Sequence, residues 1–212
     1  MRTAKYKEDH SSQLPAMLLL SNLGWEYLPP ERMQEMRQGN QKTVLLEPVL
    51  RKWLRANNKI EFHGKEYDFT EVNINEAIEK LAGIKFTEGV RKANADAYDM
   101  LTIAISLEQR IGGDRKSFNL KYIDWKHPEN NIYQFTAEFP VLREGRNDTY
   151  RPDIVLFVNG IPMVVIENKR PDLKTKEGTP VDQAIRQHAR NQNVEEGIPK
   201  LFLYSQILLA VD

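Results

Sequence analysis

The fold is decided by the stretch Arg151-Pro-Asp-Ile-Val-Leu-Phe-Val-Asn-Gly-Ile-Pro-Met-Val-Val-Ile-Glu-Asn-Lys-Arg170. It holds two dense apolar runs rich in β-branched residues, which predict buried strands over Asp153–Val158 and Ile161–Ile166. Asn159-Gly160 between the runs is a strong hairpin turn signal. The stretch therefore predicts two adjacent antiparallel strands in the protein core.

Charges in this stretch are confined to the strand ends. Asp153 opens the first strand, and Glu167 and Lys169 finish the second. Because side chains alternate along a strand, Glu167 and Lys169 project from the same face. These three residues are the candidate functional side chains of the hairpin.

The turn decides whether Asp153 shares that face. A two-residue loop at Asn159-Gly160 would pair Asp153 with Ile166 and place it on the face opposite Glu167. A three-residue loop over residues 158–160, with a bulge at the glycine, makes Asp153 a diagonal neighbour of Glu167, about 7–8 Å away at the backbone. We predict the bulged loop.

Such an acidic pair has a definite chemistry. Two carboxylates about 5 Å apart repel by roughly 3 kcal/mol at an effective dielectric of 20, so they share a proton or bind a cation. Oxygen ligands in a chain without cysteine suit Mg²⁺ or Mn²⁺, with Asp153 and Glu167 as ligands. Beside them, Lys169 could orient a water or stabilise charge on a phosphate, which favours phosphodiester hydrolysis. The alternative is a hairpin whose charged ends simply reach water.

A helix with clear start signals follows the hairpin over Thr179–Asn193, with Thr179 at the cap and Pro180 at the first position. A polar stripe of Gln183, Gln187 and Asn191 recurs every four residues along it. These amides could hold a phosphate or the attacking water if the helix crosses the site, or they could be solvated.

Composition bounds the remaining possibilities. The 212 residues include 30 basic and 30 acidic side chains, and the 41% hydrophobic content predicts a globular rather than a disordered chain. No apolar run could cross a bilayer, and no signal peptide opens the chain, so a cytoplasmic protein is expected. Zero cysteines exclude cysteine nucleophiles and thiolate zinc sites. Net neutrality argues against coating nucleic acid by bulk charge, but not against a local site.

The chain reads as helix-rich first and strand-rich later, which predicts an α/β fold with a mixed sheet flanked by helices. The expected helices cover Leu14–Leu23 after a Ser11-Ser12 cap, Thr43–Asn57, Asn73–Leu81, Glu88–Ile111 and Thr179–Asn193. Further strands are expected over Ile60–Phe69 as a hairpin, Phe118–Trp125, Tyr133–Leu142 and Lys200–Val211.

Pro152-Asp153 with Glu167-x-Lys169 resembles the motif of the PD-(D/E)xK nucleases. More specifically, the chain is similar to the N-terminal endonuclease domain of the restriction (R) subunit of type I restriction–modification enzymes. The likeness extends over Leu18–Tyr27, Ser117–Trp125, Arg151–Arg170 and Leu201–Ala210.

This resemblance implies a restriction-endonuclease-like sheet, Mg²⁺ bound by Asp153 and Glu167, and catalytic assistance from Lys169. Gln187 matches the glutamine of a Gln-x-x-x-Tyr motif in related nucleases, and Asn191 stands where that motif has tyrosine.

The resemblance also implies one endonuclease domain over residues 1–212, with a mostly helical part at 1–115 and a nuclease core at 116–212. Family R subunits couple cleavage to an ATP-driven translocase. No Gly-x-x-x-x-Gly-Lys-Ser/Thr stretch occurs here, so we expect a fragment of a larger chain whose ATP site lies elsewhere. The implied partners are double-stranded DNA and the modification and specificity subunits. Two alternatives stay open: a stand-alone repair or recombination nuclease, and a nuclease-like DNA-binding or assembly module without catalysis.

Overall fold

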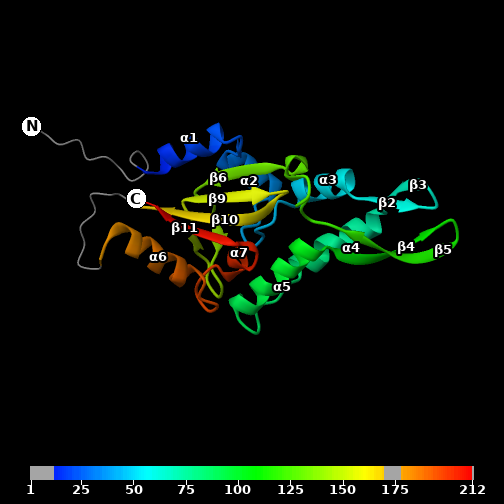
Figure 1. Ribbon diagram of the computed structural model, residues 1–212. Coiled ribbons are helices and arrows are strands. Elements are labelled where there is room, and N and C mark those ends of the chain that lie inside the picture. Colours follow the sequence, from blue (N-terminus) through cyan, green and yellow to red (C-terminus); the bar gives the residue numbers. More distant parts are fainter. Residues whose placement is uncertain (1–11, 170–177, 212) are drawn as a thin grey trace, which may run out of the picture.

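A five-stranded mixed sheet lies at the centre of the computed structural model, which describes residues 12–169 and 178–211 (Figure 1). The middle strands run antiparallel to one another, and each edge strand runs parallel to its neighbour. This arrangement confirms the predicted α/β class. The strands, in spatial order, are β1 (Glu26–Tyr27), β6 (Tyr133–Ala137), β9 (Ile154–Val158), β10 (Ile161–Asn168) and β11 (Ile207–Val211).

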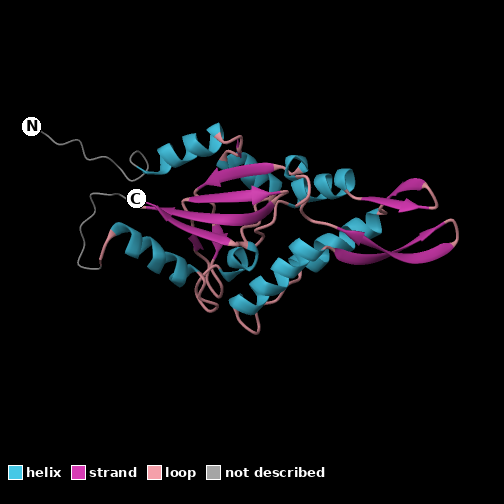
Figure 2. Ribbon diagram, viewed as in Figure 1, coloured by secondary structure: helices cyan, strands magenta, loops and turns pink. Residues whose placement is uncertain are grey.

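Helices cover both faces of this sheet (Figure 2). On one face, α1 (Leu14–Asn22) buries Leu20 against Phe135, Ile154, Leu156 and Ile166, and α2 (Pro30–Met36) follows. On the other face, α6 (Pro180–Asn191) contacts β10 and β11, and α7 (Pro199–Tyr204) contacts β10. The end of β10 therefore lies between a helix from each half of the chain.

Much of the rest of the molecule extends away from α6 (Figure 1). Two hairpins project at the far end: β2 (Lys59–Phe62) with β3 (Lys65–Asp68), and β4 (Ile105–Ile111) with β5 (Asp114–Leu120). The other elements are α3 (Glu47–Asn57), α4 (Glu71–Ala82), α5 (Val90–Ile103), a 3₁₀ turn at Pro128–Asn130, and the short pair β7 (Val141–Leu142) and β8 (Thr149–Tyr150).

The predicted long helix over Glu88–Ile111 is wrong in its second half. The helix stops at Ile103, and Ala104 takes a positive φ of 75° before β4 begins. Residues of β4 alternate between buried and exposed, the period of a strand rather than a helix. Gly112-Gly113, predicted to end the helix, forms the β4–β5 turn with φ values of 59° and 98°.

The predicted closing strand over Lys200–Val211 is also wrong in its first half. Residues 201–204 are all buried and form α7, whose first position is Pro199, and the strand begins only at Ile207. A continuous apolar run fits a buried helix as well as a buried strand, so periodicity could not separate them.

Other predictions hold with shifted ends. The helix expected over Thr43–Asn57 starts at Glu47. The helix expected over Asn73–Leu81 is capped by Thr70 rather than by an asparagine. The strand expected over Phe118–Trp125 ends at Leu120. The first helix is confirmed, but Ser12 does not cap it, and Ser11 lies outside the described residues.

Candidate active site

The β9–β10 hairpin brings Asp153 and Glu167 to one face by a different route from the one predicted. The turn has two residues, with Ile161 opposite Val158, so the predicted three-residue loop is wrong. The register then shifts between Pro162 and Val164, which makes Met163 an extra residue on β10. Beyond this bulge Ile166 lies opposite Ile154, and one further step places Asp153 opposite Glu167.

Local contacts explain why the turn is tight. Asn159 and Gly160 both have positive φ, 54° and 81°, as a two-residue hairpin turn requires. The Asn159 side chain is buried, donates to Tyr122 O (2.9 Å) and accepts from Ile132 N (2.8 Å). Leu46 N donates to Gly160 O (2.8 Å), which ties the turn to the start of α3. With the turn fixed in this way, the extra residue must be accommodated farther along β10.

The two acids have different surroundings. Glu167 is completely buried, and its Oε2 accepts a hydrogen bond of 2.6 Å from Gln187 Nε2 of α6. Asp153 is partly exposed, and its Oδ2 accepts a hydrogen bond of 2.7 Å from the backbone N–H of Asn168. The structure thus brings the side chains of Asp153, Glu167 and Gln187 together.

Burial raises the pKa of Glu167 to about 8, and the neighbouring Asp153 carboxylate raises it as well. The positive charges of Lys169 and Arg190 oppose that rise. Lys169 follows β10, and its N–H continues the parallel ladder by donating to Val211 O (2.7 Å). Alternation along the strand places Lys169 on the face of Glu167. All four predicted site residues therefore lie at one end of the β9–β10 hairpin.

The donor set fits a hard divalent cation. Glu167 Oε1 is buried and accepts no hydrogen bond from any group in residues 12–169 or 178–211. A cation between the two carboxylates would satisfy this oxygen and relieve the repulsion that raises the pKa of Glu167. Within the same residues, no third histidine or acid joins the pair as a metal-holding group. Mg²⁺ tolerates such a site because it commonly keeps several waters and substrate oxygens as ligands.

The residues of the predicted polar stripe on α6 have different contacts. Gln187 contacts the acidic pair, whereas Asn191 is buried at the end of α6, where its carbonyl accepts from Ile198 N (2.7 Å). His188, next to Gln187 on α6, is also buried, and its Nε2 contacts Leu209 O of β11 (2.9 Å). Because a carbonyl can only accept, Nε2 carries the proton in this contact. His188 thereby holds α6 against β11 and keeps Gln187 within reach of Glu167.

Sequence reasoning missed two residues before α1. Gln13 Nε2 donates to the carbonyl of Asp153 (3.0 Å), and Ser12 Oγ donates to Asn168 Oδ1 (3.2 Å). Ser12 was interpreted as part of a helix cap, and no local pattern signals a contact across more than 100 residues. The only available signal was that Asn168, between Glu167 and Lys169, must face the opposite side of the sheet.

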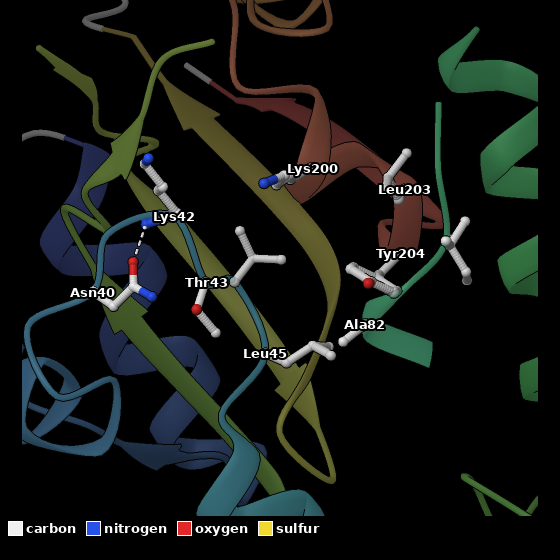
Figure 3. Close-up of a pocket in the computed structure, with 10 residues that line it drawn as sticks. Asn40, Lys42, Thr43, Leu45, Ala82, Lys200, Leu203 and Tyr204 are labelled. Atoms are coloured by element: carbon white, nitrogen blue, oxygen red, sulfur yellow. Dashed lines mark hydrogen bonds between the residues drawn. The ribbon is translucent and has the colours of Figure 1, made fainter. Parts of the chain in front are cut away.

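A separate cavity of about 290 Å³ lies between residues 40–45, the end of α4 and α7 (Figure 3). Lys42, Thr43, Lys200 and Tyr204 are among its lining residues, and Asn40 Oδ1 accepts a hydrogen bond of 3.0 Å from Lys42 N. None of the four predicted site residues lines it. The acidic pair therefore does not belong to this cavity, and its chemistry depends on the strand ends.

In the described part of the chain, no helix has both the length and the apolar character to cross a membrane.

The chain is similar to several curated proteins that share one description, the endonuclease subunit of a type I restriction enzyme. The chain is 27% identical over 219 residues to a Methanocaldococcus jannaschii protein provisionally named as the endonuclease subunit of type I restriction enzyme MjaIXP, covering 99% of this chain and 19% of that protein. It is 31% identical over 192 residues to the similarly named MjaVIIIP subunit of the same organism, covering 90% and 16%. It is 25% identical over 197 residues to the type I restriction enzyme HindI endonuclease subunit of Haemophilus influenzae, covering 91% and 17%.

The chain thus spans less than a fifth of the length of these relatives. Residues 5–212 also match the family described as "Type I restriction enzyme R protein N terminus (HSDR_N)". The family match covers the α1 contacts, the acidic hairpin and α6 together. The chain belongs to the type I restriction enzyme R protein N-terminal family.

Proposed function

We propose that this chain is a Mg²⁺-dependent endonuclease domain of a type I restriction enzyme R subunit, and that it hydrolyses DNA phosphodiester bonds without reading bases. The observation that carries the proposal is the fully buried Glu167 beside Asp153, bonded by Gln187 and accompanied by Lys169. A buried acid beside a second carboxylate costs stability, so the presence of Glu167 at this end of the hairpin favours a chemical role.

In this proposal Asp153 and Glu167 hold the metal ion, with Mn²⁺ as a substitute. When bound, Mg²⁺ polarises the scissile phosphate and lowers the pKa of a coordinated water. Burial of Glu167 keeps competing water from one side of the pair, and the hydrogen bond from Gln187 fixes which carboxylate oxygen stays free.

Lys169 has two possible tasks on the same face as Glu167. Its ammonium can orient the attacking water, or it can stabilise the negative charge that grows on the phosphate oxygens. In either case the water oxygen bonds to phosphorus while the bond from phosphorus to the leaving oxygen breaks, and the leaving oxygen takes a proton. Removing the ammonium should slow this step without unfolding the hairpin.

The curated relatives are much longer than this chain, which suggests a role for the chain within a larger subunit. We propose that residues 1–212 act as one endonuclease domain of a longer subunit, in which other parts bind ATP and translocate double-stranded DNA. The modification and specificity subunits are the proposed partners, and the specificity subunit would recognise the DNA sequence. The neutral net charge of this chain agrees with weak DNA binding by the domain itself.

The test compares Lys169→Ala with wild type in the full-length subunit assembled with its partners, following plasmid cutting with Mg²⁺ and ATP hydrolysis. Lys126→Ala is the matched control, because exposed Lys126 ends another acidic-x-Lys triplet far from the acidic pair in sequence. We expect Lys169→Ala to lose cutting while ATP hydrolysis stays, and Lys126→Ala to keep both. Cutting by Lys169→Ala at the wild-type rate would contradict the catalytic role.

A further inference from the structure

Two polar side chains at the start of α1 form hydrogen bonds with the strands that carry the two acids, from the face opposite α6. Gln13 Nε2 donates to the backbone carbonyl of Asp153 (3.0 Å), and Ser12 Oγ donates to the side-chain carbonyl of Asn168 (3.2 Å). Both side chains are buried, with 8% and 6% of their surface exposed. Buried polar groups are costly unless they are bonded, so these two contacts are specific features of the fold.

Neither residue serves its own helix. Gln13 is the N-cap of α1, yet its side chain makes no cap hydrogen bond. Leu20 also holds α1 on the sheet by packing with Ile154 and Ile166 in an apolar cluster beneath the helix. The two polar contacts therefore add to an apolar anchor of α1.

The contacts of Ser12 and Gln13 converge on one carboxylate. Ser12 holds the Asn168 side chain, and the Asn168 backbone N–H donates to Asp153 Oδ2 (2.7 Å). Gln13 holds the Asp153 carbonyl, which also accepts from Glu138 N (2.9 Å). Asp153 precedes β9, so these bonds help to fix its backbone and its carboxylate.

Side chains alternate between the two faces of the sheet along β10, and this links the Ser12–Asn168 hydrogen bond to Glu167. Glu167 faces α6, where Gln187 bonds it, and Asn168, the next residue, faces α1. A shift of Asn168 would move the backbone that carries Glu167 and would release Asp153 Oδ2 at the same time. Ser12 and Gln13 thus bond groups that are adjacent to both carboxylates without contacting either carboxylate.

We infer that Ser12 and Gln13 are positioning residues that hold Asp153 and Glu167 at the separation needed to bind a divalent cation. The inference rests on the proposed function. Supporting groups behind metal ligands commonly change metal affinity or activity by 10–100-fold when they are removed. Only a hydrogen-bond donor suits position 13, because the carbonyl of Asp153 can only accept.

The experiment uses the full-length subunit carrying Ser12→Ala or Gln13→Met, with Ser12→Thr as the variant that keeps the hydroxyl. Ser21→Ala, an exposed serine on α1, is the matched control. Mn²⁺ binding is measured by calorimetry without DNA, and the Mg²⁺ concentration for half-maximal cutting is measured in the assembled enzyme. Thermal unfolding is followed for each variant.

We expect Ser12→Ala and Gln13→Met to weaken Mn²⁺ binding about 10-fold or more and to raise the Mg²⁺ requirement similarly. Ser12→Thr and Ser21→Ala should match wild type. Mn²⁺ affinities of both test variants within twofold of wild type would overturn the inference, and so would a loss no larger than that of Ser21→Ala. Failure of the proposed function is distinguishable, because Glu167→Ala would then still cut DNA. If Gln13→Met does not fold, Ser12→Ala with its threonine rescue decides the matter.

Discussion

Replacing Glu167 with glutamine should stabilise this protein at neutral and alkaline pH while abolishing its proposed activity. The folded protein holds the pKa of Glu167 at about 8, against an ordinary value of 4.5, mainly because the side chain is buried. Between these two values the folded state keeps a proton that the unfolded state has released. Stability therefore falls as pH rises from about 4.5 to 8, and the loss is complete above that window.

The size of the effect follows from the gap of about 3.5 pH units, which corresponds to at most roughly 5 kcal/mol. Because repulsion from the Asp153 carboxylate adds to the effect of burial on Glu167, we expect about 2–5 kcal/mol at pH 8. Glutamine has nearly the same shape, can still accept from Gln187 through its amide oxygen, and can donate to Asp153 through its amide nitrogen. The substitution removes the buried charge and leaves the packing intact.

Urea unfolding at pH 5 and pH 8 measures this difference. Wild type should lose stability between the two pH values, and Glu167→Gln should lose about 2–5 kcal/mol less. Glu61→Gln is the matched control, since Glu61 is exposed on β2, and it should follow wild type at both pH values. Added Mg²⁺ should restore stability to wild type at pH 8 but not to Glu167→Gln, because the ligand binds the folded acid pair. Equal pH dependence in wild type and Glu167→Gln would refute the assignment of a buried, proton-binding Glu167.

Three further predictions concern the elements that support the site. Gly160→Ala should lower the free energy of unfolding by roughly 2–3 kcal/mol, because Gly160 has a positive φ and an added Cβ would lie 2.6 Å from the backbone oxygen of Leu46. Gly64 also has a positive φ but has open space around it, so Gly64→Ala should lower the free energy of unfolding by only about 1 kcal/mol. Urea unfolding measures both values. Gln187→Met should lower the cutting rate about 10–100-fold, with unfolding changed by under about 2 kcal/mol, and an unchanged rate would exclude a role in orienting the buried acid. Thr179→Ala should lower the free energy of unfolding by about 1 kcal/mol because it removes one half of a reciprocal capping box, and thermal melting checks this value.

Much of the site could be predicted because its signals are local. The apolar runs of β9 and β10 and the charges at their ends are contiguous in the sequence, and the cap of α6 is a short pattern. The helix start expected at Thr179 forms, with Asp182 N donating to Thr179 Oγ1 (3.2 Å). Such features depend only on residues that are close together in the chain, so they can be recognised in a single sequence.

The errors have non-local causes. The register of the hairpin depends on Asn159, whose side chain bonds Tyr122 and Ile132 in other segments, and on the backbone of Leu46. Residues 105–111 become a strand because they pair with β5, although their composition also suits a helix. The roles of Ser12 and Gln13 depend on contacts across more than 100 residues. Tertiary partners decided each of these cases.

The bulge at Met163 has a consequence for comparing and engineering these chains. Thirteen residues separate Asp153 from Glu167, one more than a regular hairpin with a two-residue turn needs to place the two acids opposite each other, and the bulge accommodates the extra residue. Deleting Met163 should therefore give a regular hairpin that keeps both acids on one face. A deletion that the bulge does not absorb would instead rotate one acid to the α1 side, even if every motif residue remained. An alignment that places one gap between the two acids can thus compare a bulged hairpin with a regular one that holds the same site.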